Sequence, residues 1–245
     1  MTAGTLGLAG LAACSGSDAK DVGAVEDLMR EHGILRRVLL VYAESVPRLR
    51  ADAASVLASH LNKAAQLFHD FGEEYHERKL EEAHIFPRIA KAGGPAAGLV
   101  DTLLKQHQRG REITVFILGA TATGTVSAAN AESLARAFET FVRMYQSHTA
   151  REDTVIFPAW KDALSASEIE ELGDQFEDIE KAQFGGDGFA DAVKQVDGIE
   201  RALGFADLAQ FTAPPPPQSG KSSGKGGNAT AKAPLSSPLP PNWVP

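Results

Sequence analysis

The strongest constraint on the fold is a helical spacing of apolar residues that persists through four long segments. In the first segment, Val25, Leu28, Leu35, Val38 and Tyr42 recur at intervals of three, four and seven residues. These intervals place the side chains on one face of an amphipathic α-helix. No segment shows sustained alternation of apolar and polar residues, so no sheet is predicted. The sequence therefore predicts an all-α protein.

Short breakers divide the chain into these helices. Pro47 and the charged residues after it mark the end of the first segment, and Gly93-Gly94-Pro95 ends the second. Pro95 suits the first position of the third helix, and Thr123-Gly124-Thr125 forms the next turn. The predicted helices cover about residues 21–49, 51–92, 95–122 and 128–163. Four long helices joined by short turns predict an up-down-up-down four-helix bundle.

Further segments flank the bundle, which is expected to span residues 21–165. Ser167 and Glu170 have the spacing of a capping box, which predicts a short helix there. A last helix is expected from Phe189 to Leu203, so residues 166–211 form a helical extension. Residues 212–245 are rich in Pro, Gly and Ser and are predicted to be a disordered tail.

The N-terminal residues 1–20 resemble a leader sequence. The only cysteine, Cys14, follows Leu11-Ala12-Ala13 after a short apolar stretch, which is similar to the lipobox of a bacterial lipoprotein. We therefore expect an extracytoplasmic or periplasmic protein with a lipid anchor at Cys14. No Lys or Arg precedes the apolar stretch, so a cytoplasmic protein with an Ala/Gly-rich N-terminus is the alternative.

Charge and hydropathy argue against nucleic-acid binding and against a membrane-spanning helix, so a membrane is expected as a partner only through the lipid anchor at Cys14. The net charge is −8 and the predicted folded part has no basic cluster, whereas nucleic-acid binding needs a positive surface. No run of 18 or more apolar residues occurs, so no membrane-spanning helix is predicted.

A short pattern occurs twice, once near the end of the second helix and once in the fourth. Residues 81–87 read EEAHIFP and residues 152–158 read EDTVIFP. The shared pattern is E-[ED]-x-x-I-F-P, and a histidine lies upstream of each copy. The repetition points to one role carried by two helices.

The spacing of histidine and glutamate in these copies suits metal ligands. His148 and Glu152 are four residues apart and lie on one helix face. His76 and Glu81 are five apart, which would separate their side chains on a regular helix. Either the helix carries a π-type turn there, or Glu77 or Glu82 takes the place of Glu81.

The other two helices each add one histidine, His32 in the first and His107 in the third. The order H…HxxxxE…H…HxxxE with the I-F-P signature resembles the hemerythrin-like, HHE cation-binding family. The resemblance covers about residues 25–160. It implies a non-haem iron site, with two iron ions, held by His32, His76, Glu81, His107, His148 and Glu152. Imidazole and carboxylate suit iron, and carboxylates can bridge two ions.

The resemblance also implies a small partner, namely dioxygen, peroxide or nitric oxide, which the protein senses, stores or detoxifies. Oxygen-carrying hemerythrins have a second histidine one turn from the first on the third helix. Here the positions on either side of His107 are Leu103 and Arg111, which argues against reversible oxygen carriage.

Three alternatives to a di-iron binding protein can be compared. A di-iron peroxidase-like enzyme uses the same ligands, and the sequence alone does not separate it from a binding protein. A metal-free structural bundle is the second alternative. A ferritin-like oxidase needs a Glu-x-x-His motif on each of two helices, but here Glu73-x-x-His76 and Glu81-x-x-His84 lie on one helix, so we reject it.

Overall fold

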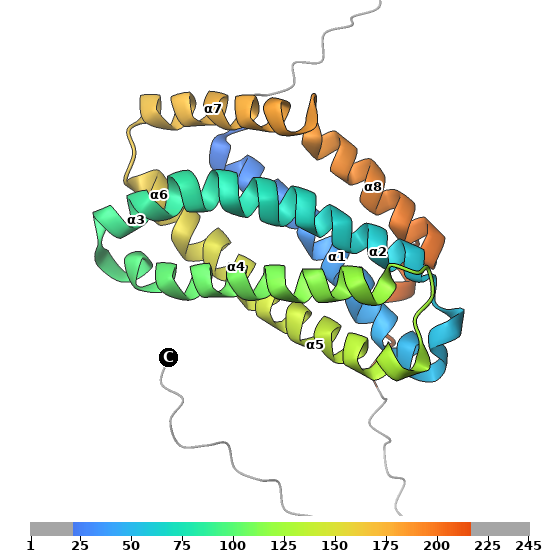
Figure 1. Ribbon diagram of the computed structural model, residues 1–245. Coiled ribbons are helices and arrows are strands. Elements are labelled where there is room, and N and C mark those ends of the chain that lie inside the picture. The colour runs from blue at the N-terminus through green and yellow to red at the C-terminus, as the bar shows by residue number, and fades with distance from the viewer. Residues whose placement is uncertain (1–21, 217–245) are drawn as a thin grey trace, which may run out of the picture. The chain divides into compact units, whose positions relative to one another are not determined.

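The computed structural model describes residues 22–216, and within these residues it contains helices and no strand (Figure 1). The prediction of an all-α bundle is confirmed. Among the described helices, none combines the length and the apolar character needed to cross a membrane. Cys14 and most of the Pro-rich tail lie outside the described residues, so the expected lipid anchor and disordered tail stay predictions.

Four long arms form the bundle, and consecutive arms run in opposite directions (Figure 1). The first arm is α1 and the third is α4. The second arm joins α2, a π-helix η2 and α3, and the fourth arm joins α5, a π-helical turn η3 and α6. Their bounds are α1 Ala24–Asp52, α2 Ala58–Leu67, η2 Phe68–Ile85, α3 Phe86–Ala92, α4 Gly94–Thr121, α5 Ala128–Arg151, η3 Glu152–Ile156 and α6 Phe157–Asp162.

Two predicted helix ends were wrong. Pro47 lies inside α1, which continues to Asp52. The buried side chains Val46 and Leu49 extend the apolar stripe past the proline, and their packing outweighs the single backbone hydrogen bond that proline removes. The second arm begins at Ala58 and not at 51, because Asp52 instead caps a short 3₁₀-helix, η1 (Ala53–Ser55), by accepting the Ala54 N–H.

An aromatic core fills the bundle where α1 packs along α5. Tyr42 stacks on Phe138 with ring centroids 4.3 Å apart, and Phe141 meets Phe68 edge-on at 4.8 Å. All four side chains are fully buried. Such offset and edge-on pairs add to the stabilisation that comes from burying apolar area. This core fixes the spacing of the arms on which the polar centre below depends.

Two helices follow the bundle, α7 (Ala166–Phe184) and α8 (Gly188–Leu203), with a short 3₁₀-helix η4 (Leu208–Phe211) after them. The capping box of α7 is made by Ser165 and Glu168, so the predicted pair Ser167 and Glu170 was wrong by two residues. The turn between α6 and α7 is therefore shorter than predicted by two residues. Phe176 of α7 stacks on Trp160 of α6 at 5.9 Å, which holds α7 against the bundle.

Glu180 on α7 makes part of the stability depend on pH. Its carboxylate accepts the Phe189 N–H at 2.6 Å. Burial, and then the negative charges of Glu31, Asp187 and Asp27, raise the pKa of Glu180 to about 7. Because the folded-state pKa lies above that of the unfolded chain, the fold favours the protonated form, and this contribution is lost as pH rises through the folded-state pKa.

We therefore expect Glu180→Gln, which keeps an acceptor oxygen and cannot ionise, to be more stable than the wild type at alkaline pH. With solvent screening of this partly buried group, the free energy of unfolding should differ by about 1–2 kcal/mol near pH 8 and converge below about pH 4. Urea unfolding of the metal-free protein at both pH values measures this. A difference that does not change with pH would contradict the assignment.

Candidate metal centre

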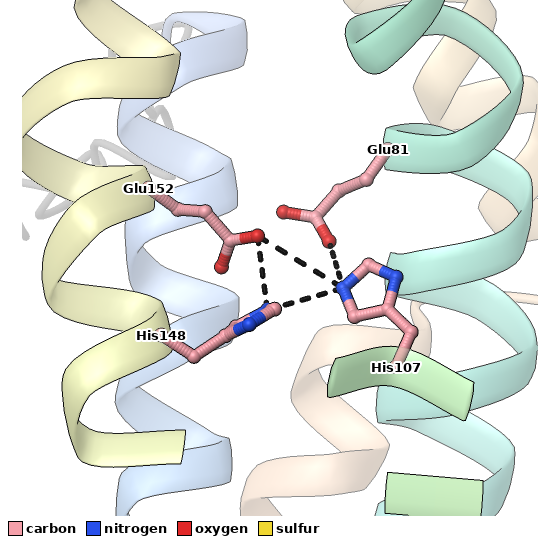
Figure 2. Close-up of side chains that lie close together, drawn as sticks. All are labelled: Glu81, His107, His148 and Glu152. Carbon is pink, nitrogen blue, oxygen red and sulfur yellow. Dashed lines mark hydrogen bonds and ion pairs between the residues drawn. The ribbon is translucent and has the colours of Figure 1, made fainter. Parts of the chain in front are cut away.

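All six residues predicted as metal ligands meet in the interior of the bundle. They come from all four arms, and each is at most 3% exposed. They form two overlapping groups in which one potential ligand atom of every residue lies within 4.8 Å of the others. The first group is Glu81, His107, His148 and Glu152, shown in Figure 2, and the second is His32, His76 and Glu81.

The four histidines form two pairs with their Nε2 atoms face to face. The Nε2 atoms of His32 and His76 are 3.0 Å apart, and those of His107 and His148 are 3.1 Å apart. Two nitrogens bound at right angles to one ion, each about 2.1 Å from it, would lie about 3.0 Å apart. Each pair therefore has the separation of two neighbouring ligands on one ion.

Every Nδ1 atom of these histidines has an oxygen partner on the side away from the centre. An acceptor at Nδ1 holds the proton there and leaves Nε2 as a lone-pair donor to a metal. The partners are Asp153 for His32 (2.7 Å), Glu31 for His76 (2.5 Å), Glu82 for His107 (2.9 Å) and the Gln106 Oε1 for His148 (2.9 Å).

The two carboxylates lie between the histidine pairs. Glu81 Oε1 is 3.4 Å from His76 Nε2, and its Oε2 is 3.3 Å from His107 Nε2. Glu152 Oε2 is 3.5 Å from His32 Nε2, and its Oε1 is 2.9 Å from His148 Nε2. Each carboxylate thus turns one oxygen toward each pair.

These carboxylates are buried without adequate compensation by the protein. All four oxygens of Glu81 and Glu152 lack a hydrogen-bond partner, although buried polar groups nearly always have one. Burial, and then the charge of Glu81, raise the pKa of Glu152 well above its usual range. Burial, and then the charge of His107, lower the pKa of His148 well below its usual range. Against the effect of burial, the charges of Glu81 and Glu77 raise the pKa values of His76 and His107 above their usual range. Bound cations would displace the protons of these imidazoles and compensate the same carboxylates, so the centre fits metal ions.

The π-helix η2 brings Glu81 to the same face as His76, which answers the question left by their five-residue spacing. A π-helix closes its turns with hydrogen bonds between residues five apart. The Phe86 N–H donates to the Glu81 carbonyl, and the Phe157 N–H donates to the Glu152 carbonyl in the same way. Each wide turn directly precedes Pro87 or Pro158, whose rings crowd the helical turn before them.

Glu77 and Glu82, the alternatives to Glu81, lie with His107 in a third group of potential ligand atoms, but the oxygens of Glu77 already have partners in the protein. Its Oε1 accepts the Tyr145 hydroxyl at 2.7 Å, and its Oε2 accepts from the Arg111 guanidinium at 3.1 Å. Arg111 also pairs with Glu82. The cation on the third arm therefore neutralises acidic groups beside the centre.

Tyr75 and Tyr145 do more than pack. The hydroxyl of Tyr75 donates to Glu31 Oε1 at 2.9 Å, as that of Tyr145 does to Glu77. Glu31 therefore binds Tyr75 with one oxygen and His76 with the other. This arrangement fixes the orientation of the His76 ring.

A glycine on α4 makes room for the Tyr145 hydroxyl. A Cβ atom at Gly110 would lie 1.9 Å from the Tyr145 oxygen and 2.8 Å from its Cζ. We expect Gly110→Ala to lower the free energy of unfolding of the metal-free protein by about 1–3 kcal/mol, because an inserted methyl group forces repacking. Urea unfolding measures this. The loss should be smaller when the same change is made in Tyr145→Phe, and an equal loss in both backgrounds would contradict the contact.

The remaining histidines lie outside both groups. His69 bonds to its neighbour Asp70 at 2.7 Å and is about one-third exposed. His84 packs against Phe176 at 5.5 Å, and His60 lines a surface pocket between α2 and α8. Four aromatic side chains near the centre are fully buried, namely Phe86, Phe141, Phe157 and Trp160. Phe157 stacks on His32 and Phe86 on His107, at 5.3 and 5.5 Å, and both rings shield the centre from water.

Sequence reasoning missed the outer partners of the histidines. Glu31 is next to His32 but contacts His76, and Asp153 is next to Glu152 but contacts His32. Gln106 likewise precedes His107 but contacts His148. The available signal was a polar residue beside each predicted ligand. Spacing along one helix cannot show that this neighbour serves a histidine of another arm.

Comparison with known proteins relates the chain to one domain family. A family model described as Hemerythrin, the hemerythrin HHE cation binding domain, matches residues 23–160. That span contains all six residues of the two groups. Relatives include uncharacterized proteins of Mycobacterium bovis and Mycobacterium tuberculosis, each 41% identical over 227 residues, which cover 86% of this chain and 88% of the relative. No solved structure matches the chain.

Proposed function

Because this chain belongs to the hemerythrin HHE cation-binding domain family, we propose that it is a non-haem di-iron protein. It binds or reacts with dioxygen, peroxide or nitric oxide, and so serves in sensing, storage or detoxification. Iron binding in general follows from the family and from the buried His/Glu groups. The presence of two ions and the identity of the small molecule are proposed in addition to iron binding.

One observation carries the proposal of two ions. Two histidine pairs lie on either side of two carboxylates, and each carboxylate turns one oxygen to each pair. Six ligands around a single ion would converge on one point. Here Glu81 instead belongs to both groups of potential ligands. A bridging carboxylate between two ions has this geometry.

The chain's own residues hold and shield such a centre. The oxygens at Nδ1 hold each imidazole with Nε2 pointing inward, and the buried rings of Phe86 and Phe157 limit water around it. Iron, when bound, supplies redox chemistry and a coordination position for a small molecule. The protein contributes two negative charges, from Glu81 and Glu152, that favour cations in a low-dielectric interior.

One experiment distinguishes a binding protein from an enzyme. The full chain is loaded anaerobically with ferrous iron and mixed with dioxygen, hydrogen peroxide or nitric oxide while the optical spectrum is recorded. A persistent adduct supports binding, and repeated consumption of peroxide with an added reductant supports a peroxidase-like enzyme. A protein that takes up no iron from an iron-replete solution would overturn the proposal in favour of a metal-free bundle.

Loss of an outer partner should weaken iron binding without removing a ligand. Glu31→Gln keeps the shape of the side chain but loses the negative charge that polarises His76. We expect iron affinity to fall by about 10–100-fold, the usual effect of changing such a partner. Competition with a chelator measures this. Glu74→Gln, at a half-buried position of the second arm outside the groups of potential ligands, is the control, and equal affinity in the two variants would contradict the role of Glu31.

A further inference from the structure

All the tyrosines of this protein lie in its interior. The chain has three tyrosines, Tyr42, Tyr75 and Tyr145, and each is at most 1% exposed. Tyr145 is the one whose ring contacts a proposed iron ligand, with its centroid 5.4 Å from that of His148. We propose that Tyr145 is a redox-active residue that donates one electron when peroxide reacts at the iron centre. The inference rests on the proposed function.

The hydroxyl of Tyr145 is accommodated at a cost to the fold. It points at the middle of α4, where Gly110 leaves space that any Cβ would fill. Glycine inside a helix is less favourable than alanine by about 1 kcal/mol. The rings around Tyr145 are Phe68 and Phe141, at 4.8 and 4.6 Å. Phenylalanine would suit this apolar environment and bring no hydroxyl, so the hydroxyl points to a role beyond packing.

The partner of the hydroxyl fits proton-coupled oxidation. Tyr145 donates to Glu77 Oε1 at 2.7 Å, inside the protein. A phenol that lost an electron and kept its proton would be a buried cation, which is costly in a low-dielectric interior. Transfer of the proton to Glu77 along the existing hydrogen bond removes that cost. Arg111 holds the other oxygen of Glu77, so the acceptor stays in place during the transfer.

The step balances with hydrogen peroxide as the oxidant. Peroxide takes up two electrons and two protons as its O–O bond breaks, and it leaves as two water molecules. Tyr145 supplies one electron, and a ferrous ion that becomes ferric supplies the other. The hydroxyl proton of Tyr145 passes to Glu77, and the two protons used by peroxide come from solvent. The products are a neutral tyrosyl radical, protonated Glu77, one ferric ion and water.

Tyr42 provides a control within the same chain. Its ring is as buried as that of Tyr145 and packs against Phe138 and Phe141, at 4.3 and 5.7 Å. Its hydroxyl has no hydrogen-bond partner among the described residues. Tyr42→Phe therefore removes a buried tyrosine and leaves the hydrogen bonds around the centre in place.

Electron paramagnetic resonance tests the inference without an activity assay. The full chain, loaded with ferrous iron, is mixed with one equivalent of hydrogen peroxide and frozen within seconds. We expect a tyrosyl radical signal in the wild type and in Tyr42→Phe, and its loss in Tyr145→Phe. The signal should narrow when the protein is made with ring-deuterated tyrosine. Because the chain has three tyrosines, a signal that persists per bound iron in both Tyr42→Phe and Tyr75→Phe lies on Tyr145.

The outcomes that overturn the inference are distinct from failure of the proposed function. Iron bound normally with no radical in the wild type, or a radical that persists in Tyr145→Phe, overturns the role of Tyr145 alone. A radical that deuterated tyrosine does not narrow does the same. A chain that binds no iron overturns both proposals. Deuterium labelling together with Tyr42→Phe and Tyr75→Phe assigns the radical by elimination, so the inference stays testable even if Tyr145→Phe folds poorly.

Discussion

His148→Ala should lose most of the iron of the protein. His148 supplies one Nε2 of the second histidine pair and lies 2.9 Å from Glu152, so its removal deletes a ligand and frees the carboxylate beside it. Bound metal stabilises the folded state by about 4 kcal/mol when its concentration is a thousand times its dissociation constant. We therefore expect the rise in Tm that iron produces in the wild type to disappear in the variant.

The comparison must separate metal binding from packing, because truncating a buried ring also leaves a cavity. The quantity measured is the difference in Tm between the iron-loaded and the metal-free forms of each protein, together with iron content by elemental analysis. His84→Ala is the control, since His84 lies outside both groups and packs on Phe176. Unchanged iron content in His148→Ala would count against the whole ligand set.

Glu152→Gln should stabilise the metal-free form of the protein and weaken its binding of iron. In the metal-free protein Glu152 and Glu81 are buried carboxylates without hydrogen-bond partners. Replacing Glu152 by a neutral amide of similar shape should raise the free energy of unfolding of the metal-free form by about 1–3 kcal/mol, because a buried carboxyl group without compensation is costly whether it stays ionised or takes up a proton. The same change removes a proposed bridge, so we expect iron binding to fall to one ion or none.

Glu73→Gln serves as the matched control. Glu73 is as buried as Glu152, and one of its oxygens also lacks a partner, but it belongs to neither group of potential ligands. Its replacement should leave iron content unchanged. Iron titration and urea unfolding of the metal-free forms measure both effects. If Glu152→Gln destabilised the metal-free protein or kept two ions, the carboxylate would not have the role proposed for it.

The helical arms could be predicted because the apolar period and the breakers act locally. The period of α1, the glycine turn at Gly93 and the cap at Ser127 depend on residues close in sequence. The errors came where tertiary packing opposes a local signal. Pro47 should end a helix by local rules, but the packing of Leu49 carries α1 past it.

The candidate centre could be predicted because each arm carries one histidine and two arms carry the repeated I-F-P pattern. The sequence left the acidic residue on the second arm undecided, because its choice depends on the type of helix between His76 and Glu81. Hydrogen bonding of Glu77 to Tyr145 and Arg111 involves three different arms. Contacts of that kind depend on how the arms are rotated against one another, which a single sequence does not give.

The π-helix η2 explains how the second and fourth arms can carry similar ligands at different spacings. His76 and Glu81 are separated by one residue more than His148 and Glu152, and the 18-residue π-helix accommodates that surplus. Loss of one codon between them would give the second arm the spacing of the fourth, and gain of one codon would do the reverse in the fourth. The type of helix thus absorbs the difference in spacing, and both arms present a histidine and a glutamate to the same centre.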